Sequence, residues 1–367
     1  MGKHLVFVGG GHAHLEPLSR LDEYVERGHR VTAISLDDYH YYSGMGPGVL
    51  GRFYEPKQAR FPLKELTEIR GGNFLAGRVT RIDPDARELV LESGDRVSYD
   101  VVSFNTGSSV PLPPSGGPLP NAYPVKPIAN LLKARQAIRS KLADGEDLRV
   151  LVIGGGAAGV EVSANCLKLS AEAPGNVHLT LIAGSRLLAG FPGRARRLAL
   201  DSLQARGARV REDSWVERLG DDHATVSGGL ECGYDMALIA SGVRPSDLFQ
   251  RSKLPATSDG GLRVNANLQC VKHPEIFGAG DCIGMEGHKL ARVGVHAVMQ
   301  GTVLFDNLMA ALEGGKMRAF APRRNYMLIL NMGDGSGIAC KWGLTADGRI
   351  AFALKDYIDR RFVRRYQ

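Results

Sequence analysis

The 367-residue sequence predicts an α/β protein with two similar parallel-sheet units, the second inserted in the first, and a small C-terminal α+β segment. A strand-like apolar run, a glycine-rich turn and an amphipathic stretch follow one another over residues 4–27, and the same order restarts at residue 148. The end of each unit also repeats, as YDVVSFNTG at 99–107 and YDMALIASG at 234–242. A chain of this length exceeds one hydrophobic core, so more than one domain is expected.

The first unit opens with a strand at residues 4–8, followed by the glycine-rich turn and a helix. Pro17 lies inside this helix and should bend it. A second strand is expected at 31–36. Residues 39–54 are rich in aromatic residues and glycine and show little periodicity, which predicts a loop shaped around a flat ligand.

In the second unit, the sequence pattern predicts a strand at 148–153, a helix to about residue 169 and a strand at 177–183. A Pro/Gly-rich segment at 111–122 marks the boundary that precedes it. We therefore expect three parts: residues 1–110 with 246–315, residues 111–245, and residues 316–367. In the last part, alternation predicts three antiparallel strands, followed by a basic helix at 354–367. The three strand sequences are YMLILNM, GIACKWGL and RIAFAL.

Composition and charge limit the functional classes. The net charge is +7 and the pI is about 9.2, which suits an anionic cofactor, membrane surface or acidic protein. No helix-turn-helix, zinc or aromatic-basic platform supports nucleic-acid binding. The five cysteines form no CxxC pair, so we expect a reducing, cytoplasmic setting. The N-terminus looks like a first strand, not a signal peptide, and no apolar run approaches the ~18 residues of a membrane span.

Both glycine loops point to dinucleotides. The second, Gly154-x-Gly156-x-x-Gly159, follows a strand and opens a helix, as the fingerprint requires. Its glycines permit the tight turn, the approach of a pyrophosphate and close helix–strand packing. In the first loop His14 replaces the third glycine, so helix and strand should lie further apart there. His12 and His14 form an HxH pair, but further ligands at suitable spacing are missing and no metal site is expected.

Further segments occur in a specific order across nearly the whole chain: GGGHAH at the start, NTGSS at 105–109, GGGAAGVE at 154–161, ASGVRP at 240–245, and then IFGAGDC and ARVGVHAVMQG within 276–301. With them the chain resembles the flavoprotein superfamily with two dinucleotide-binding domains. Its closest resemblance is to type II NADH dehydrogenases, sulfide:quinone oxidoreductases and the NADH-dehydrogenase-like domain fused to some selenide, water dikinases. The resemblance implies two Rossmann-like domains, FAD as cofactor and NADH or NADPH as donor.

The resemblance also implies site residues. The expected FAD contacts are Gly9, Gly10, Gly11, His12, Ser35, Asp37, Ser43, Gly44, Met45, Val79, Thr106, Gly107, Asp281 and Val295. The expected nicotinamide contacts are Gly154, Gly156, Gly159, Glu161, Arg186 and Gly242. Asp281 would accept hydroxyl hydrogen bonds from FAD, a role compatible with capping a helix.

Three residues are candidates for a catalytic role at the flavin. Arg292 stands where the family often has a lysine near the flavin. The alternative interpretation of Arg292 is a solvated surface cation. Lys126 lies where a sulfide:quinone oxidoreductase would carry a cysteine. His296 lies on the helix whose N-terminus should face the flavin N1–C2=O edge, where it could donate a proton or simply pack. Gln300 matches a glutamine of quinone-reducing relatives.

The thiols and the second nucleotide site depart from the family pattern. No redox cysteine pair follows the first glycine loop, so electrons should pass directly through flavin; Cys340 is the one candidate for sulfur chemistry. After the second strand of the nicotinamide unit, the expected acidic residue is replaced by Ala183. Arg186 could then bind the 2′-phosphate of NADPH, or the unit binds nicotinamide weakly.

The C-terminal helix has an apolar face with helical spacing, made of Leu354, Tyr357, Ile358 and Phe362. With its arginines this face suits the inner surface of an anionic membrane, since relatives sit on membranes through such helices. The alternative is packing on the first domain or on a dimer partner.

These observations together predict an FAD-dependent oxidoreductase that passes electrons from NAD(P)H to a quinone-like acceptor. The alternatives are a sulfide or selenium-compound oxidoreductase that uses Cys340 and a non-catalytic FAD-binding accessory protein.

Overall fold

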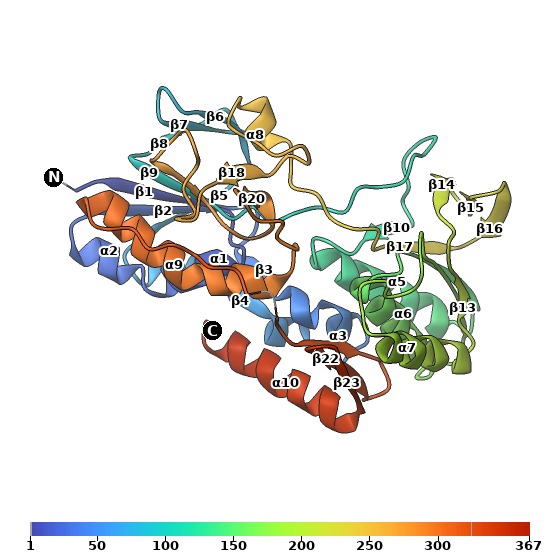
Figure 1. The fold of residues 1–367 in the computed structure, drawn as a ribbon. Coiled ribbons are helices and arrows are strands. Elements are labelled where there is room, and N and C mark those ends of the chain that lie inside the picture. Colours follow the sequence, from blue (N-terminus) through green and yellow to red (C-terminus); the bar gives the residue numbers. More distant parts are fainter. Residues whose placement is uncertain (1, 324) are drawn as a thin grey trace.

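The computed structural model describes residues 2–323 and 325–367, which form two lobes above a C-terminal segment (Figure 1). The first lobe contains a five-stranded parallel sheet with the strand order β19-β9-β1-β2-β5. Its strands are β1 (His4–Val8), β2 (Arg30–Ser35), β5 (Asn73–Ala76), β9 (Val101–Phe104) and β19 (Ile276–Gly278). β1 and β9 are buried along their whole length, as expected for strands covered on both faces.

Helices and small sheets cover this first sheet. α1 (His12–Ser19) packs along α9 (Gly294–Glu313), the longest helix of the described chain. The other helices and strands of the lobe are α2 (Asp22–Glu26), β3 (Tyr39–Tyr41), α3 (Gly46–Leu50), β4 (Arg60–Pro62), α4 (Leu63–Glu68), β6 (Val79–Asp83), β7 (Glu88–Leu91), β8 (Arg96–Ser98), α8 (Leu248–Arg251), β18 (Leu262–Val264) and β20 (Ile283–Met285).

The predicted helix after the first glycine loop is shorter than expected. It ends at Ser19, two residues after Pro17, and a separate helix begins at Asp22. Pro17 is thus accommodated inside α1, and the interruption comes after it, at residues 20–21.

The second lobe repeats the architecture with a parallel sheet in the order β10-β17-β11-β12-β13. Its members are β10 (Ala122–Pro124), β11 (Leu148–Ile153), β12 (Val177–Ile182), β13 (Arg209–Arg211) and β17 (Met236–Ile239), with α5 (Ala129–Ala143), α6 (Ala157–Ser170) and α7 (Gly193–Ala205). An antiparallel sheet of β14 (Val216–Leu219), β15 (His223–Val226) and β16 (Leu230–Gly233) lies beside it. The chain leaves the first sheet after β9 and returns to it as β19, so the predicted fold class is confirmed.

The C-terminal segment corrects one prediction. Its antiparallel sheet contains β21 (Leu328–Asn331), β22 (Gly337–Lys341) and β23 (Leu344–Gly348), and α10 (Arg349–Arg364) follows directly. RIAFAL is therefore the first part of α10 and not a strand. The buried residues of α10 explain this, because they recur every four residues, at helical spacing: Ala351, Lys355, Asp359 and Val363.

Candidate dinucleotide-binding sites

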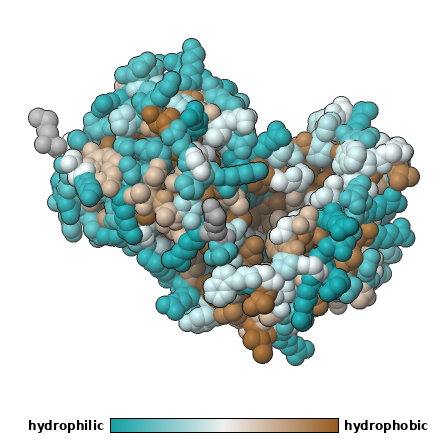
Figure 2. Space-filling model, viewed as in Figure 1, coloured by the Kyte–Doolittle hydropathy of each residue, from teal (hydrophilic) through white to brown (hydrophobic). Residues whose placement is uncertain are grey.

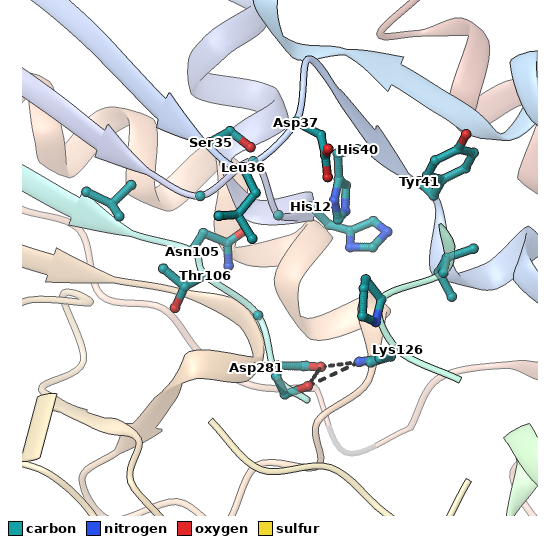
Figure 3. A pocket seen from close by; sticks show the side chains of 18 of the residues that line it. His12, Ser35, Leu36, Asp37, His40, Tyr41, Asn105, Thr106, Lys126 and Asp281 are labelled. Atoms are coloured by element: carbon teal, nitrogen blue, oxygen red, sulfur yellow. Dashed lines mark hydrogen bonds and ion pairs between the residues drawn. The ribbon is translucent and has the colours of Figure 1, made fainter. Parts of the chain in front are cut away.

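A cavity of about 310 Å³ lies in the first lobe where β1, β2 and β9 end. This is the edge at which parallel α/β sheets bind their ligands. Twelve of the predicted site residues line it: Gly9, Gly10, Gly11, His12, Ser35, Asp37, Ser43, Val79, Thr106, Gly107, Lys126 and Asp281. Figure 3 shows several of these side chains directed into the same space.

The first glycine loop is held by close packing against Asn105, which follows β9. Gly9 has φ +86°, and a Cβ there would lie 2.5 Å from the Asn105 backbone oxygen. A Cβ on Gly11 would collide with the Asn105 side chain. Asn105 Oδ1 accepts the backbone N–H of Ala13 at 3.1 Å, while Nδ2 donates to the Ala279 carbonyl. Asn105, which the sequence interpretation did not single out, therefore joins the start of α1 to the end of β19.

His14 occupies the position of the missing third glycine and is fully buried. Its Nδ1 lies 2.5 Å from the Gly9 carbonyl oxygen and its Nε2 2.8 Å from Ser103 Oγ on β9. Burial lowers the pKa of His14 to about 3, so the ring is neutral at physiological pH. His14 therefore fills the space between helix and sheet that a third glycine would leave open.

His12 and His40 face the same cavity as a pair. Their rings are 5.0 Å apart in an edge-to-face arrangement, and each Nε2 is buried without a hydrogen-bond partner in the described structure. Burial and the charge of Lys126 lower the pKa of His12 to about 3. Figure 3 shows both rings beside each other at the cavity wall. His40 comes from β3, and the sequence indicated only that its loop surrounds a flat ligand.

An ion pair crosses the cavity floor (Figure 3). Lys126 Nζ lies 2.6 Å from Asp281 Oδ2 and 3.2 Å from Ser108 Oγ, and the Ser108 hydroxyl also donates to Asp281 at 2.8 Å. Both charged side chains are mostly buried, at 26% and 12% exposure. Three segments distant in sequence are thus tied together by one carboxylate.

The remaining candidates near this site do not line the cavity. Arg292 donates to the Asp281 carbonyl at 2.9 Å and forms a 2.7 Å ion pair with Asp259, so it is not a free surface cation. Gln300 is buried and accepts the Gly280 backbone N–H at 2.6 Å. Val295 is the second residue of α9, next to Gly294, which does line the cavity.

His296 is 7% exposed and its Nδ1 is buried without a partner. Its ring packs edge-on against Tyr326, with 5.3 Å between centroids, and burial lowers its pKa. The structure therefore places this candidate on α9 beside the cavity wall, facing the C-terminal segment.

A charged cluster joins the second lobe, the C-terminal helix and the loop at Gly44. Lys355 Nζ donates to the Gly44 carbonyl and to Asp359 Oδ2, both at 2.8 Å. Glu161 Oε1 accepts the Asn331 backbone N–H at 2.8 Å. Burial raises the pKa of Glu161 to about 7, against the opposing charge of Lys355. The sequence indicated Glu161, but it did not indicate that a buried lysine would come from the last helix.

The second glycine loop has the backbone that its motif requires. Gly154 has φ +126°, and a Cβ on Gly159 would collide with the Gly154 carbonyl oxygen. α6 begins at Ala157, directly after the loop. Gly242 has φ +103° in the turn after β17, and Arg186 is exposed in the turn after β12.

No cysteine is among the residues that line the described cavity. All five are free, and Cys340 is buried on β22, where burial raises the pKa of its thiol. Cys282 follows Asp281 but directs its sulfur to the carbonyls of Phe104 and Ala279. The geometry therefore gives no thiol at the cavity for sulfur chemistry.

Comparison with known proteins shows the family of this chain and the proteins that it resembles. A family model described as pyridine nucleotide-disulphide oxidoreductase matches residues 3–301. The chain is 28% identical over 370 residues to demethylphylloquinone reductase NdbB of Synechocystis sp., covering 96% of this chain and 90% of that protein. It is 27% identical over 282 residues to ferroptosis suppressor protein 1 of Taeniopygia guttata, covering 73% and 71%.

Two solved structures share the fold over almost the whole chain. Sulfide:quinone oxidoreductase from Aquifex aeolicus has a TM-score of 0.82 at 18% identity and covers 100% of this chain and 91% of its own. NDH2 from Plasmodium falciparum, in complex with NADH, has a TM-score of 0.81 at 15% identity and covers 99% and 96%. Since the family model matches most of the sequence, the chain belongs to the pyridine nucleotide-disulphide oxidoreductase family.

Proposed function

We propose that this protein is an FAD-dependent oxidoreductase that takes electrons from NAD(P)H and delivers them to a quinone-like acceptor without a redox-active disulfide. The observation that carries the proposal is the pairing of two dinucleotide loops with a cavity that no cysteine lines in the described structure. Relatives named as a demethylphylloquinone reductase and as type II NADH:quinone oxidoreductases support the quinone acceptor.

The residues at the first cavity fit FAD. The glycine loop has no room for side chains, so a pyrophosphate can approach its backbone N–H groups at the start of α1. Asp37, exposed just after β2, would bind the adenosine ribose, as the family pattern implies. The buried Nε2 atoms of His12 and His40 lack protein partners and can meet polar atoms of the cofactor. When bound, FAD supplies two-electron acceptance from a nicotinamide and electron transfer to a quinone.

The charged residues at the cavity floor would orient the cofactor. The 2.6 Å ion pair fixes Lys126 and Asp281 in position, so a carboxylate oxygen and an ammonium group would both be available to polar atoms of the cofactor. The N-terminus of α9 points its unpaired N–H groups toward this region, since Gly294 and Ala297 line the cavity. Arg292, bonded to the Asp281 carbonyl, would act as a positioning residue.

Quinone reduction consumes protons, and two groups near the cavity could supply them. Glu161 has its pKa raised to about 7, the range in which a carboxyl group both holds and releases a proton. Lys355 and Asp359 lie next to it and contact the Gly44 loop. His296, with an unpaired Nδ1, is the second candidate for proton transfer.

The C-terminal segment offers a surface for membrane contact. Six large apolar side chains are exposed in the turn between β22 and β23, on β23 and on α10, and we call them the C-terminal apolar face: Trp342, Leu344, Ile350, Leu354, Tyr357 and Ile358. Brown atoms gather at the lower end of the molecule in Figure 2, where Figure 1 places these elements. Adjacent arginines suit an anionic inner membrane surface. No helix of the described residues is long and apolar enough to cross a bilayer.

This face differs in part from the one expected from the sequence. Phe362 packs against Tyr42 and Phe61 in an aromatic cluster, so it does not face solvent with the others. Arg365 pairs with Glu16 at 2.6 Å and holds the C-terminus on α1. Homodimer formation stays a prediction.

A quinone reductase assay tests the proposed function. The FAD-loaded protein should oxidise NADPH or NADH only when a soluble short-chain quinone is present, and Cys340→Ala should leave the rate unchanged. Loss of the reaction in Cys340→Ala, or sulfide-dependent quinone reduction that exceeds the nicotinamide-dependent rate, would instead support the sulfur-compound alternative. A protein that binds FAD but reduces no quinone with either nicotinamide would be an accessory protein.

A further inference from the structure

The carboxyl end of β12 lacks the acidic side chain that commonly binds the adenosine ribose hydroxyls of NADH. The residue after β12 is Ala183, which is completely buried. Residues 184–186 are exposed, and the next two, Leu187 and Leu188, are buried again. The Leu188 N–H donates to the Gly155 carbonyl at 2.8 Å. The exposed tripeptide Gly-Ser-Arg is thus anchored beside the second glycine loop.

The nearest carboxylate does not replace the missing acid. Glu212 follows β13, and its Oε1 accepts the Leu187 backbone N–H at 2.6 Å. Its other oxygen forms an ion pair with Arg196 of α7. Because each oxygen already has a partner and the charge is neutralised by Arg196, Glu212 holds the 184–186 turn and is a weaker acceptor for a ribose hydroxyl than an unpaired carboxylate would be.

The charge left at this edge favours an anion. Arg186 makes no hydrogen bond or ion pair within the described residues, and Arg211, at the end of β13, is also exposed. Asp213, two residues after Arg211, is exposed as well. A guanidinium binds a phosphate through two parallel hydrogen bonds, and the Ser185 hydroxyl can add a third.

We propose that Ser185 and Arg186 form a subsite for the 2′-phosphate of NADPH, so that the enzyme prefers NADPH to NADH. The inference rests on the proposed function for the identity of the donor, but its geometry is confined to the end of β12. NADH carries a 2′-hydroxyl in place of the phosphate, and this turn has no carboxylate to accept the hydrogen bond of that hydroxyl. The missing hydrogen bond lowers the affinity for NADH.

Equilibrium binding separates this subsite from catalysis. Calorimetric titration of the FAD-loaded protein with 2′,5′-ADP and with ADP compares ligands that differ at the 2′ position. We expect 2′,5′-ADP to bind about tenfold or more tightly than ADP, and Arg186→Ala to remove most of this difference while ADP binding is unchanged. Arg139→Ala, which removes an exposed arginine from α5 in the same lobe, is the matched control and should preserve the difference.

Equal affinities for the two nucleotides, no binding of either, or a preference that survives Arg186→Ala would overturn the proposal. A second variant, Ala183→Asp, restores the usual acid and should shift the preference toward ADP and NADH. Anaerobic flavin bleaching distinguishes failure of the proposed 2′-phosphate subsite from failure of the proposed oxidoreductase function. Bleaching that is equally effective with NADH and NADPH contradicts the subsite and leaves the oxidoreductase function standing. Absence of bleaching with a persistent 2′,5′-ADP preference contradicts the function and leaves the subsite standing.

Discussion

Glu161→Gln tests the charged cluster between the second lobe and the C-terminal helix. Glutamine keeps the shape of the side chain and an oxygen that can accept the Asn331 N–H, now 2.8 Å from Glu161 Oε1. The variant replaces the ionisable carboxyl group with an amide that does not titrate. The change in pH dependence therefore reports the environment of this one carboxyl group.

The linkage between proton binding and folding gives the sign and the size of the change in the free energy of unfolding with pH. Burial raises the pKa of Glu161 from 4.5 to about 7 in the folded protein, so the folded state binds a proton more tightly than the unfolded state. Stability must then fall as pH rises through this window. A shift of that size corresponds to about 3 kcal/mol at most, and because the side chain keeps partial exposure we expect about 2 kcal/mol.

The assay is urea unfolding of wild-type and variant protein, both loaded with FAD, at several pH values from 4.5 to 8.5 and constant salt. The free-energy difference between them should move by about 2 kcal/mol in favour of Glu161→Gln as pH rises. Glu217→Gln, an exposed position on β14, is the control and should follow the wild type at every pH. A difference between wild type and Glu161→Gln that stays constant with pH would refute the reasoning.

Three further perturbations follow from the contacts. Asp281→Asn removes the partner of Lys126 and should weaken FAD retention about tenfold in an equilibrium filtration assay of flavin fluorescence; unchanged retention would contradict the placement of FAD. Tyr366→Phe removes the 2.8 Å bond to Glu16 and should cost about 1 kcal/mol, or ~2 °C in Tm, and an unaltered Tm would show that this C-terminal contact is not stabilising. Replacing Trp342 and Ile350 by serine should reduce sedimentation with anionic vesicles about tenfold or more without changing soluble quinone reduction, and full sedimentation would exclude the C-terminal apolar face as the contact.

Sequence periodicity predicted most of the fold because each lobe contains strands buried along their length, separated by glycine turns that only a few backbones can accommodate. The insertion of one unit in the other followed from the repeated pattern. The helix that begins at Arg349 was predicted as a strand, since RIAFAL is too short for apolar periodicity to separate a strand from a helix. Its identity depends on tertiary packing, which buries Lys355 and Asp359 and leaves Ile350 exposed.

The cavity was also largely predictable, because twelve predicted residues line it and most belong to motifs of fixed spacing. The exceptions are side chains whose partners are distant in sequence. Nothing near His14 indicates that Ser103 would accept or donate its second hydrogen bond. Similarly, the contact of Lys355 with Gly44 joins residues 311 positions apart and arises only when the last helix docks on the first lobe.

The most direct test of the central claim is a stoichiometric reductive titration of the purified yellow protein under anaerobic conditions. The account predicts that flavin absorbance bleaches fully at one NAD(P)H per FAD, because no disulfide stores a second electron pair, and that one quinone restores it. Uptake of two NAD(P)H per FAD would reveal a redox-active thiol pair, and no bleaching by either nicotinamide would contradict the proposed electron path altogether.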